Sequence, residues 1–79
     1  KKYARQILVG HDVAAQIAAG NHAISGVMIE SHLIEGRQDV VPGRELTFGQ
    51  SVTDACINWQ DTRIVLDELA EAVRRRRKA

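Results

Sequence analysis

One run of apolar residues, Ala23–Ile29, constrains the fold more than any other part of the sequence. It is short, almost continuous in apolar character and β-branched at three of its positions, which is typical of a strand buried on both faces of a parallel sheet. A parallel sheet needs several strands joined by crossover connections. Because the 79 residues offer one convincing strand of this kind, we expect an α/β unit whose sheet is completed by other sequence.

A helix is predicted before this strand, over about residues 3–18. Apolar residues such as Ile7 and Ile17 recur there at spacings that bring them to one side of a helix. Gly20, just after the helix, tolerates the left-handed conformation that ends many helices. Gly10 lies in the middle and costs about 1 kcal/mol relative to alanine, unless close packing requires it.

A second helix is predicted near the end of the sequence. Asp61 or Thr62 can cap its N-terminus. Its predicted apolar stripe consists of Val65, Leu69, Ala72 and Val73. Acidic residues precede basic ones along this helix, which complements the helix dipole, and Glu71 can pair with Arg74 or Arg75 one turn later.

Residues 31 to about 51 form a polar stretch that is longer than an ordinary connection of about 4–6 residues. Long loops of this kind are usually functional or disordered. Residues 40–46 can close as a hairpin, with Pro42 and Gly43 at the centre of a type II turn. We therefore expect part of this loop to be ordered.

Charge and composition limit the classes of partner and compartment. The net charge of +1 is too small to indicate nucleic acid or an anionic membrane as a partner of the whole chain. Five of the eleven basic residues lie in the run Arg74–Lys78; a solvated helix end is favoured there over a nucleic-acid patch, since no aromatic residues interleave it. The single cysteine and the absence of a membrane span or signal-peptide core favour a cytoplasmic protein.

Two acidic residues are the main candidates for chemistry. Glu30 ends the apolar strand, where active sites of barrels and open α/β sheets collect, and Asp54 precedes the last helix. Taken alone, each has an ordinary alternative, as the first solvated residue after a strand and as a capping residue. His32, Cys56 and His11 could also bind metal, but a polar loop histidine, a buried thiol and a surface imidazole are the favoured interpretations.

Two long motifs carry a resemblance to a known family: GVMIESHLIEG at residues 26–36 and SVTDACINW at 51–59. They closely resemble class I DAHP synthase, 3-deoxy-7-phosphoheptulonate synthase, and the likeness extends over essentially all 79 residues. It matches the C-terminal end of that family. The resemblance implies that residues 1–79 are the C-terminal helix–strand–long loop–helix portion of a single catalytic (β/α)8 TIM barrel, incomplete as an isolated chain.

The resemblance also implies a metal-dependent transferase. Family members condense phosphoenolpyruvate with erythrose 4-phosphate, the first step of the shikimate pathway to aromatic amino acids. Their divalent metal is held by a cysteine, a histidine, a glutamate and an aspartate, and matching residue by residue assigns the last two to Glu30 and Asp54. The histidine ligand precedes the lysine that matches Lys1, and the cysteine lies far upstream, so Cys56 inherits no ligand role. Neither Arg37 nor Arg44 inherits a phosphate site.

Several expectations follow from this family. The metal is expected to be manganese, iron, cobalt or zinc, acting as a Lewis acid on the aldehyde while the enol carbon attacks. The remainder of the barrel is the expected partner, within a homo-oligomer, and the isolated chain is expected to be inactive. A different class of function remains open, in which the chain is an assembly or binding module that acts through its exposed strand edge.

Overall fold

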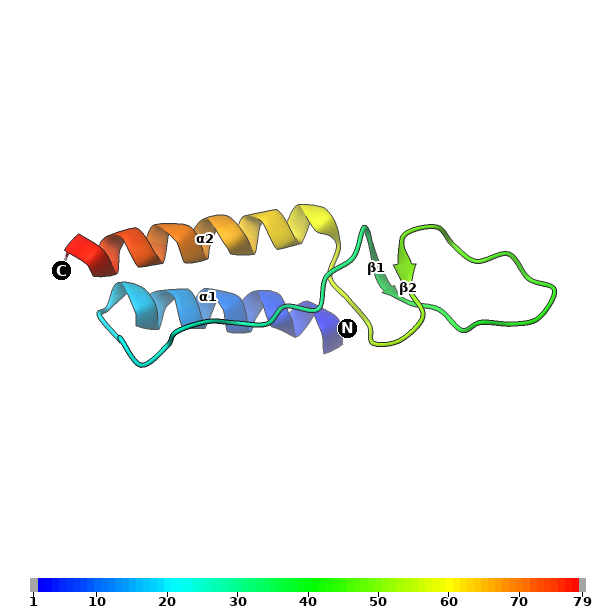
Figure 1. The fold of residues 1–79 in the computed structure, drawn as a ribbon, viewed down its shortest axis with the longest axis horizontal. Helices are drawn as coiled ribbons and strands as arrows, with labels where there is room; N and C mark the ends of the chain where they lie inside the picture. Colours follow the sequence, from blue (N-terminus) through cyan, green and yellow to red (C-terminus); the bar gives the residue numbers. More distant parts are fainter. Residues whose placement is uncertain (1, 79) are drawn as a thin grey trace.

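The computed structural model describes residues 2–78 and consists of a helix pair with a long loop at one end (Figure 1). A 3₁₀ turn, η1 (Lys2–Ala4), leads into α1 (Arg5–Ala18). Two short strands, β1 (Ile34–Arg37) and β2 (Gln50–Ser51), come next, and α2 (Trp59–Lys78) completes the order. The described chain is elongated and measures 56 × 19 × 17 Å. The loop between β1 and β2 lies at one end of it, and the C-terminal ends of both helices lie at the other (Figure 1).

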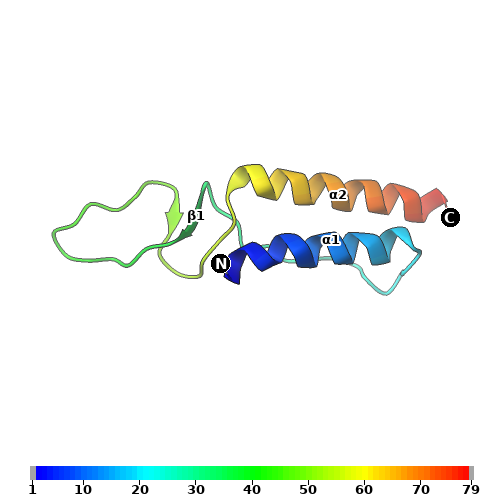
Figure 2. The same ribbon diagram turned by 180° about the vertical axis from the view of Figure 1, so that it is seen from behind.

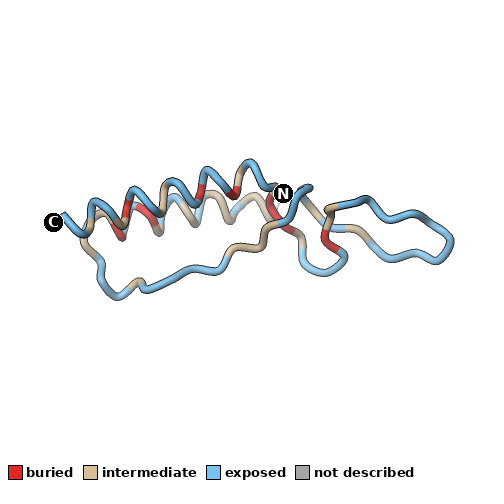
Figure 3. Tube along the Cα trace, turned by 45° about the horizontal axis from the view of Figure 1, so that its top comes forward, coloured by how far each residue is buried: buried red, intermediate tan, exposed pale blue. Residues whose placement is uncertain are grey.

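The two helices lie side by side along their length (Figure 2). Their contact is built on small and branched apolar residues, because Ala14, Ile17 and Ala72 are buried together. Residues packed around these three are Val13, Ala18, Ile24, Leu69 and Val73. The buried positions of both helices face one another in Figure 3, while the outer faces are exposed. The predicted apolar stripe of the second helix is therefore confirmed.

The ends of the helices agree with the sequence in one case and differ in the other. After α1, Gly20 has φ of +107° and its N–H donates to the Ile17 carbonyl, as expected of a helix-ending glycine. The prediction that Asp61 or Thr62 caps α2 is wrong. Asn58 is the cap, since its Oδ1 accepts the Asp61 N–H at 2.8 Å.

The predicted buried strand over Ala23–Ile29 does not form within residues 2–78. The segment is extended and runs beside α1 (Figure 1), but it has no strand assignment. Val27 and Met28 are 49% and 81% exposed, and no hydrogen bond involves the peptide groups of residues 25–29 in the described part of the chain. The physical reason is that a strand buried on both faces needs neighbours on both edges, and the described residues supply none.

The long loop is ordered at its turn and at its base. The Arg44 N–H donates to the Val41 carbonyl at 3.1 Å and Gly43 has φ of +80°, which are the features of the predicted type II turn. The arms of this turn are not paired as a hairpin; instead β1 and β2 pair in parallel at the base. Gln38 joins the two arms, because its side-chain amide donates to the carbonyls of Thr47 and Gln50.

Most of the basic run Arg74–Lys78 has structural partners. Arg74 and Arg75 both pair with Glu71, at 3.0 and 3.4 Å, as predicted. The hydrogen bond from Arg74, followed by that from Arg75, holds the pKa of the Glu71 carboxyl below its usual value. Arg76 reaches the start of the extended segment and donates to the carbonyls of Asn21 and Ile24, both at 3.0 Å. These contacts support a structural interpretation of the run.

Candidate metal centre

Glu30 ends the extended segment, and its peptide group is held from two sides. On the side of α1, the Gln6 side-chain amide accepts the Glu30 N–H at 2.8 Å and donates to the Glu30 carbonyl at 3.1 Å. On the other side, the Ile57 N–H donates to the same carbonyl at 3.0 Å. The backbone of Glu30 is therefore fixed relative to both α1 and the segment before α2.

The next residues join the extended segment to the start of α2. The His32 N–H donates to the Ile57 carbonyl at 3.0 Å, which completes a parallel bridge between Ser31 and Ile57. The Thr62 hydroxyl donates to the Asn58 carbonyl and forms a second hydrogen bond with the Ser31 hydroxyl at 2.5 Å. Thr62 is only 4% exposed, so a buried polar side chain locks this junction with its hydrogen bonds satisfied.

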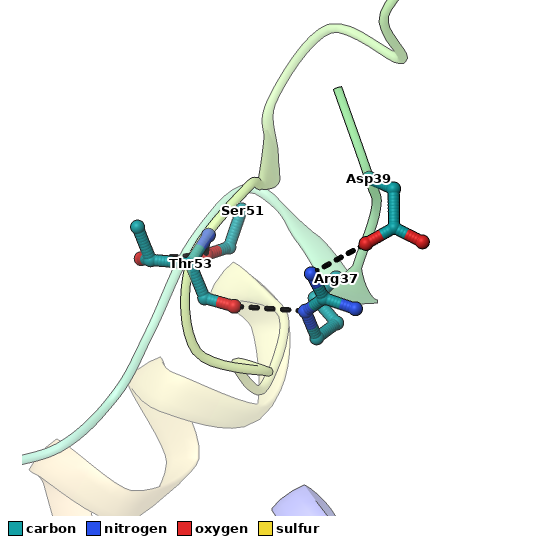
Figure 4. A network of polar contacts seen from close by, with 4 residues as sticks. All are labelled: Arg37, Asp39, Ser51 and Thr53. Carbon is teal, nitrogen blue, oxygen red and sulfur yellow. Dashed lines mark hydrogen bonds and ion pairs between the residues drawn. The ribbon is translucent and has the colours of Figure 1, made fainter. Parts of the chain in front are cut away.

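Asp54 lies in a tight loop between β2 and α2. Hydrogen bonds to Gly36 and Arg37 of β1 hold this loop in place. The Thr53 N–H donates to the Ser51 hydroxyl at 3.1 Å. Arg37 donates through Nε to the Thr53 carbonyl at 2.9 Å and pairs through Nη2 with Asp39 at 2.8 Å (Figure 4). Beyond Asp54, Cys56 exchanges backbone hydrogen bonds with Gly36 in both directions, at 2.8 and 3.1 Å.

The contacts that hold the backbone of Glu30 and those that hold the loop around Asp54 bring the two carboxyl groups together. The groups share a hydrogen bond, which raises the pKa of the Glu30 carboxyl above its ordinary value; partial loss of solvent and the negative charge of Asp54 act in the same direction. Both side chains open into a pocket of about 400 Å³. Its lining residues are Lys2, Tyr3, Gln6, Glu30, Asp54 and Ala55.

A pair of adjacent carboxylates fits one part of a divalent cation site. Two negative groups in contact repel one another when both are ionised, and a cation between them removes that repulsion while accepting their oxygen atoms as ligands. Within residues 2–78, no group of three or more histidine, cysteine, aspartate or glutamate side chains converges on one point. The pair is thus compatible with a cation whose other ligands come from elsewhere.

The other candidate residues do not join this pair. His32 Nδ1 accepts the neighbouring Leu33 N–H at 2.8 Å. Cys56 is buried, and its thiol points to the Asp54 carbonyl at 3.4 Å. His11 is exposed on α1 and contacts Glu68 of α2 at 2.7 Å. The favoured interpretations of the latter two, a buried thiol and a helix-surface imidazole, agree with these positions.

Sequence reasoning missed Gln6. It lies in the first turn of α1, and its contact with Glu30 spans 24 positions of sequence. Such a long-range contact of a single amide leaves no periodic signal in one sequence. The folded arrangement was needed to find it.

Comparison with known proteins identifies the family. The model of the DAHP synthetase I family matches residues 1–67. The chain belongs to the DAHP synthetase I family. The resemblance of its two long motifs to that family is therefore confirmed.

Individual members of the DAHP synthetase I family are similar along nearly the whole chain. The phospho-2-dehydro-3-deoxyheptonate aldolase of Haemophilus influenzae is 56% identical over 79 residues, which are 100% of this chain and 22% of that protein. The Phe-sensitive aldolase of Escherichia coli K12 is 52% identical over 98% of this chain and 22% of its own length. A Trp-sensitive aldolase of Enterobacter agglomerans is 53% identical over 96% of this chain and 22% of its own length, so both inhibitor classes share this segment.

A solved structure gives the same result for the fold. The aldolase of Francisella tularensis SCHU S4 matches with a TM-score of 0.84 and 47% identity, over 94% of this chain and 21% of that chain. The chain thus spans about a fifth of the length of the DAHP synthetase I relatives that it matches. The matched segment of the Francisella tularensis protein therefore has the same helix pair and loop. Separately, neither helix within residues 2–78 has the length and apolar character to cross a membrane.

Proposed function

We propose that the protein containing this chain is a 3-deoxy-7-phosphoheptulonate synthase, which condenses phosphoenolpyruvate with erythrose 4-phosphate. The observation that carries the proposal is that Glu30 and Asp54 line the same pocket in a chain of this family. Relatives that are 48–56% identical are named as phospho-2-dehydro-3-deoxyheptonate aldolases. The residues that would contact both substrate phosphates lie outside this segment.

The contribution of this segment is two ligands of a divalent cation. Glu30 and Asp54 would hold manganese, iron, cobalt or zinc together with a cysteine and a histidine from other sequence. When bound, such an ion supplies Lewis acidity toward the aldehyde oxygen of erythrose 4-phosphate. The two carboxylates would neutralise part of the charge of the ion and hold it at the pocket that Tyr3 and Ala55 also line.

We place the segment at the C-terminal end of a (β/α)8 barrel. In this arrangement α1 and α2 are two successive outer helices, residues 23–29 form the inner strand between them, and residues 31–58 form the loop at the carboxyl end of that strand. The order helix, extended segment, loop, helix supports this placement. A cytoplasmic homo-oligomer without nucleic-acid or membrane partners completes the proposal.

A second candidate function is that of an assembly module. It is favoured by the exposed Val27 and Met28 and by the unpaired peptide groups of residues 25–29 within the described chain. Next to them lies an apolar cavity of about 220 Å³, which Val9 and Val13 of α1 also line. An extended segment with free edges and an apolar cavity beside it is suited to accept neighbouring strands and side chains.

A chimeric enzyme tests the first candidate. These 79 residues replace the matched 22% of the Haemophilus influenzae aldolase, and the chimera should form heptulosonate phosphate. Glu30→Gln and Asp54→Asn should each weaken Mn²⁺ binding by at least about 10-fold, because each removes one charged ligand. Glu45→Gln, at an exposed loop carboxylate, is the matched control. Metal affinity and turnover that are equal in all four proteins would contradict the proposal.

The isolated chain separates the two candidates. Alone it should show no condensation activity, because it lacks the other metal ligands and both phosphate sites. Mixed with a relative from which the matched segment has been deleted, it should restore metal-dependent turnover. Association with that truncated relative without any turnover, while the chimera is also inactive, would instead favour the assembly module.

A further inference from the structure

We infer that Gln6 is a positioning residue of the metal centre, which holds the peptide of Glu30 so that its carboxylate faces Asp54. The inference rests on the proposed function, because it concerns the same pair of carboxylates. Gln6 itself is not expected to contact the ion or the substrates. Its action passes through the backbone of Glu30.

The first support is the geometry of the contact. The Gln6 amide binds the N–H and the carbonyl of the same residue, at 2.8 and 3.1 Å. In an extended chain these two groups of one residue point to the same side, and a paired strand normally satisfies both. The primary amide of Gln6, which offers a donor and an acceptor side by side, binds both groups of Glu30, and the Ile57 N–H binds the carbonyl as well. Two bonds to one residue fix its orientation as well as its position.

The second support is what the contact connects. Gln6 lies in the first turn of α1, a helix whose other end is packed against α2 through Ile17 and Ala72. The Glu30 carbonyl also accepts the N–H of Ile57, three residues after Asp54, at 3.0 Å. The carbonyl of Glu30 is therefore the point at which α1 and the segment that carries Asp54 meet.

The third support is electrostatic. Carboxylates in contact repel one another when both are ionised, so a freely moving Glu30 would turn away from Asp54 before an ion arrives. A held backbone limits this movement to rotation about the side-chain bonds of Glu30, so its carboxylate stays within reach of the pocket that Gln6 also lines. Ligands that are held in place before binding lose less conformational freedom when the ion binds. Gln6 should consequently raise metal affinity.

The expected size of the effect follows from other metal sites. Changes to groups that orient a ligand typically lower metal affinity by about 10- to 100-fold. Because Gln6 holds the backbone of Glu30 and leaves its side chain free to rotate, we expect the lower end, about 10-fold. The fold should persist, since α1 remains packed on α2 through residues that Gln6 does not touch.

The experiment uses the chimeric full-length enzyme and its metal-free form. Mn²⁺ is titrated into the protein and followed by electron paramagnetic resonance, which reports affinity and the symmetry of the ion without reference to turnover. The variant Gln6→Met keeps the length of the side chain and removes both hydrogen bonds. Gln16→Met is the matched control, because Gln16 lies on the same helix and its side-chain amide donates to Asp12 of that helix at 3.1 Å.

A second variant keeps the inference testable if Gln6→Met does not fold. Gln6→Glu retains an acceptor for the Glu30 N–H but loses the donor to its carbonyl. The added negative charge near the ion would by itself tighten Mn²⁺ binding, whereas lost positioning would weaken it. Weaker binding by Gln6→Glu therefore supports the inference, and equal or tighter binding contradicts it.

The outcomes separate this inference from the proposed function. Weaker Mn²⁺ binding and an altered spectrum in Gln6→Met, with unchanged melting temperature and with Gln16→Met like the parent, support positioning. Parental affinity in a folded Gln6→Met contradicts positioning and leaves the proposed function intact. Parental affinity in Glu30→Gln and Asp54→Asn would instead overturn the proposed function itself.

Discussion

Gly10 of α1 lies directly against Val65 of α2. A Cβ atom at position 10 would lie 2.9 Å from Val65 Cγ1, which is closer than side-chain carbons normally approach one another. Val65 is 2% exposed and β-branched, so it has little freedom to move. Gly10 is therefore required by packing, which accounts for a glycine in the middle of a helix.

Gly10→Ala should destabilise the protein despite the higher helix propensity of alanine. The propensity gain is about 1 kcal/mol, and the overpacking against Val65 costs about 1–3 kcal/mol, so we expect a net loss of about 1 kcal/mol. Urea denaturation of the chimeric enzyme measures the free energy of unfolding. Ala15→Gly, at an exposed position of the same helix, calibrates the propensity effect. A more stable Gly10→Ala would contradict the packing requirement, whereas rescue by Val65→Ala would support it.

Asn58→Ala should weaken the start of α2. It removes the side-chain acceptor of the Asp61 N–H, and loss of such a cap costs about 1 kcal/mol. Asn58→Ser is the control, because serine can still cap while it loses the 3.3 Å contact from Asn58 to Glu35. Thermal unfolding measures both variants. If Asn58→Ser lowers the melting temperature as much as Asn58→Ala, the effect comes from the lost contact with Glu35, and the capping role is contradicted.

Arg76→Met should loosen the junction between α1 and the extended segment. The change removes two hydrogen bonds to the carbonyls of Asn21 and Ile24, and we expect a loss of about 1 kcal/mol, since the contact is partly exposed. Amide hydrogen exchange around residues 21–24 measures the local effect. Arg77→Met, one position further along the run, should leave exchange there unchanged. Equal effects of the two variants would indicate a general role of charge.

The stability of the metal-free protein should fall as pH rises through the pKa of Glu30. That pKa is raised in the folded state, so the folded protein retains a proton that the unfolded chain has already lost, and its stabilising contribution is present on the acid side of this window. Metal affinity should rise over the same window, because the ion displaces the proton.

Carbon-13 NMR of the Glu30 carboxyl group tests whether its pKa is raised. Asp54→Asn should return the pKa of Glu30 toward its ordinary value, since it removes the negative charge that raises it and its amide N–H can donate to the ionised Glu30 carboxylate. A Glu30 titration that is the same with and without Asp54 would show that the two groups do not interact.

The helices were predictable because each has its own periodic apolar pattern. The stripe through Val65 and Ala72, the terminating Gly20 and the pairs of Glu71 depend on neighbours within a few positions, and the structure contains all of them. The cap of α2 was predicted three or four residues too late, at Asp61 or Thr62, because these residues and Asn58 are all favoured at caps and only the backbone geometry distinguishes them.

The strand prediction failed for a different reason. The composition of Ala23–Ile29 is typical of a strand that is buried on both faces. Such a strand forms beside other strands of the same sheet. Glu30 and Asp54 were found from strand-end logic and family resemblance, and their mutual contact agrees with that assignment without testing the ligand role. Gln6 escaped because its partner is remote in sequence and its residue type is ordinary for a helix surface.

The unpaired extended segment has a consequence for the whole enzyme. Residues 25–29 end at the peptide that Gln6 and Ile57 hold, so any strand that pairs with this segment in the complete protein is mechanically linked to Glu30 along a few stiff peptide units. Substitutions in such a neighbouring strand, distant from the ion, would shift the register or tilt of the segment. Under the proposed function, substitutions in those neighbouring strands would change which metal ion is preferred without any change in Glu30 or Asp54.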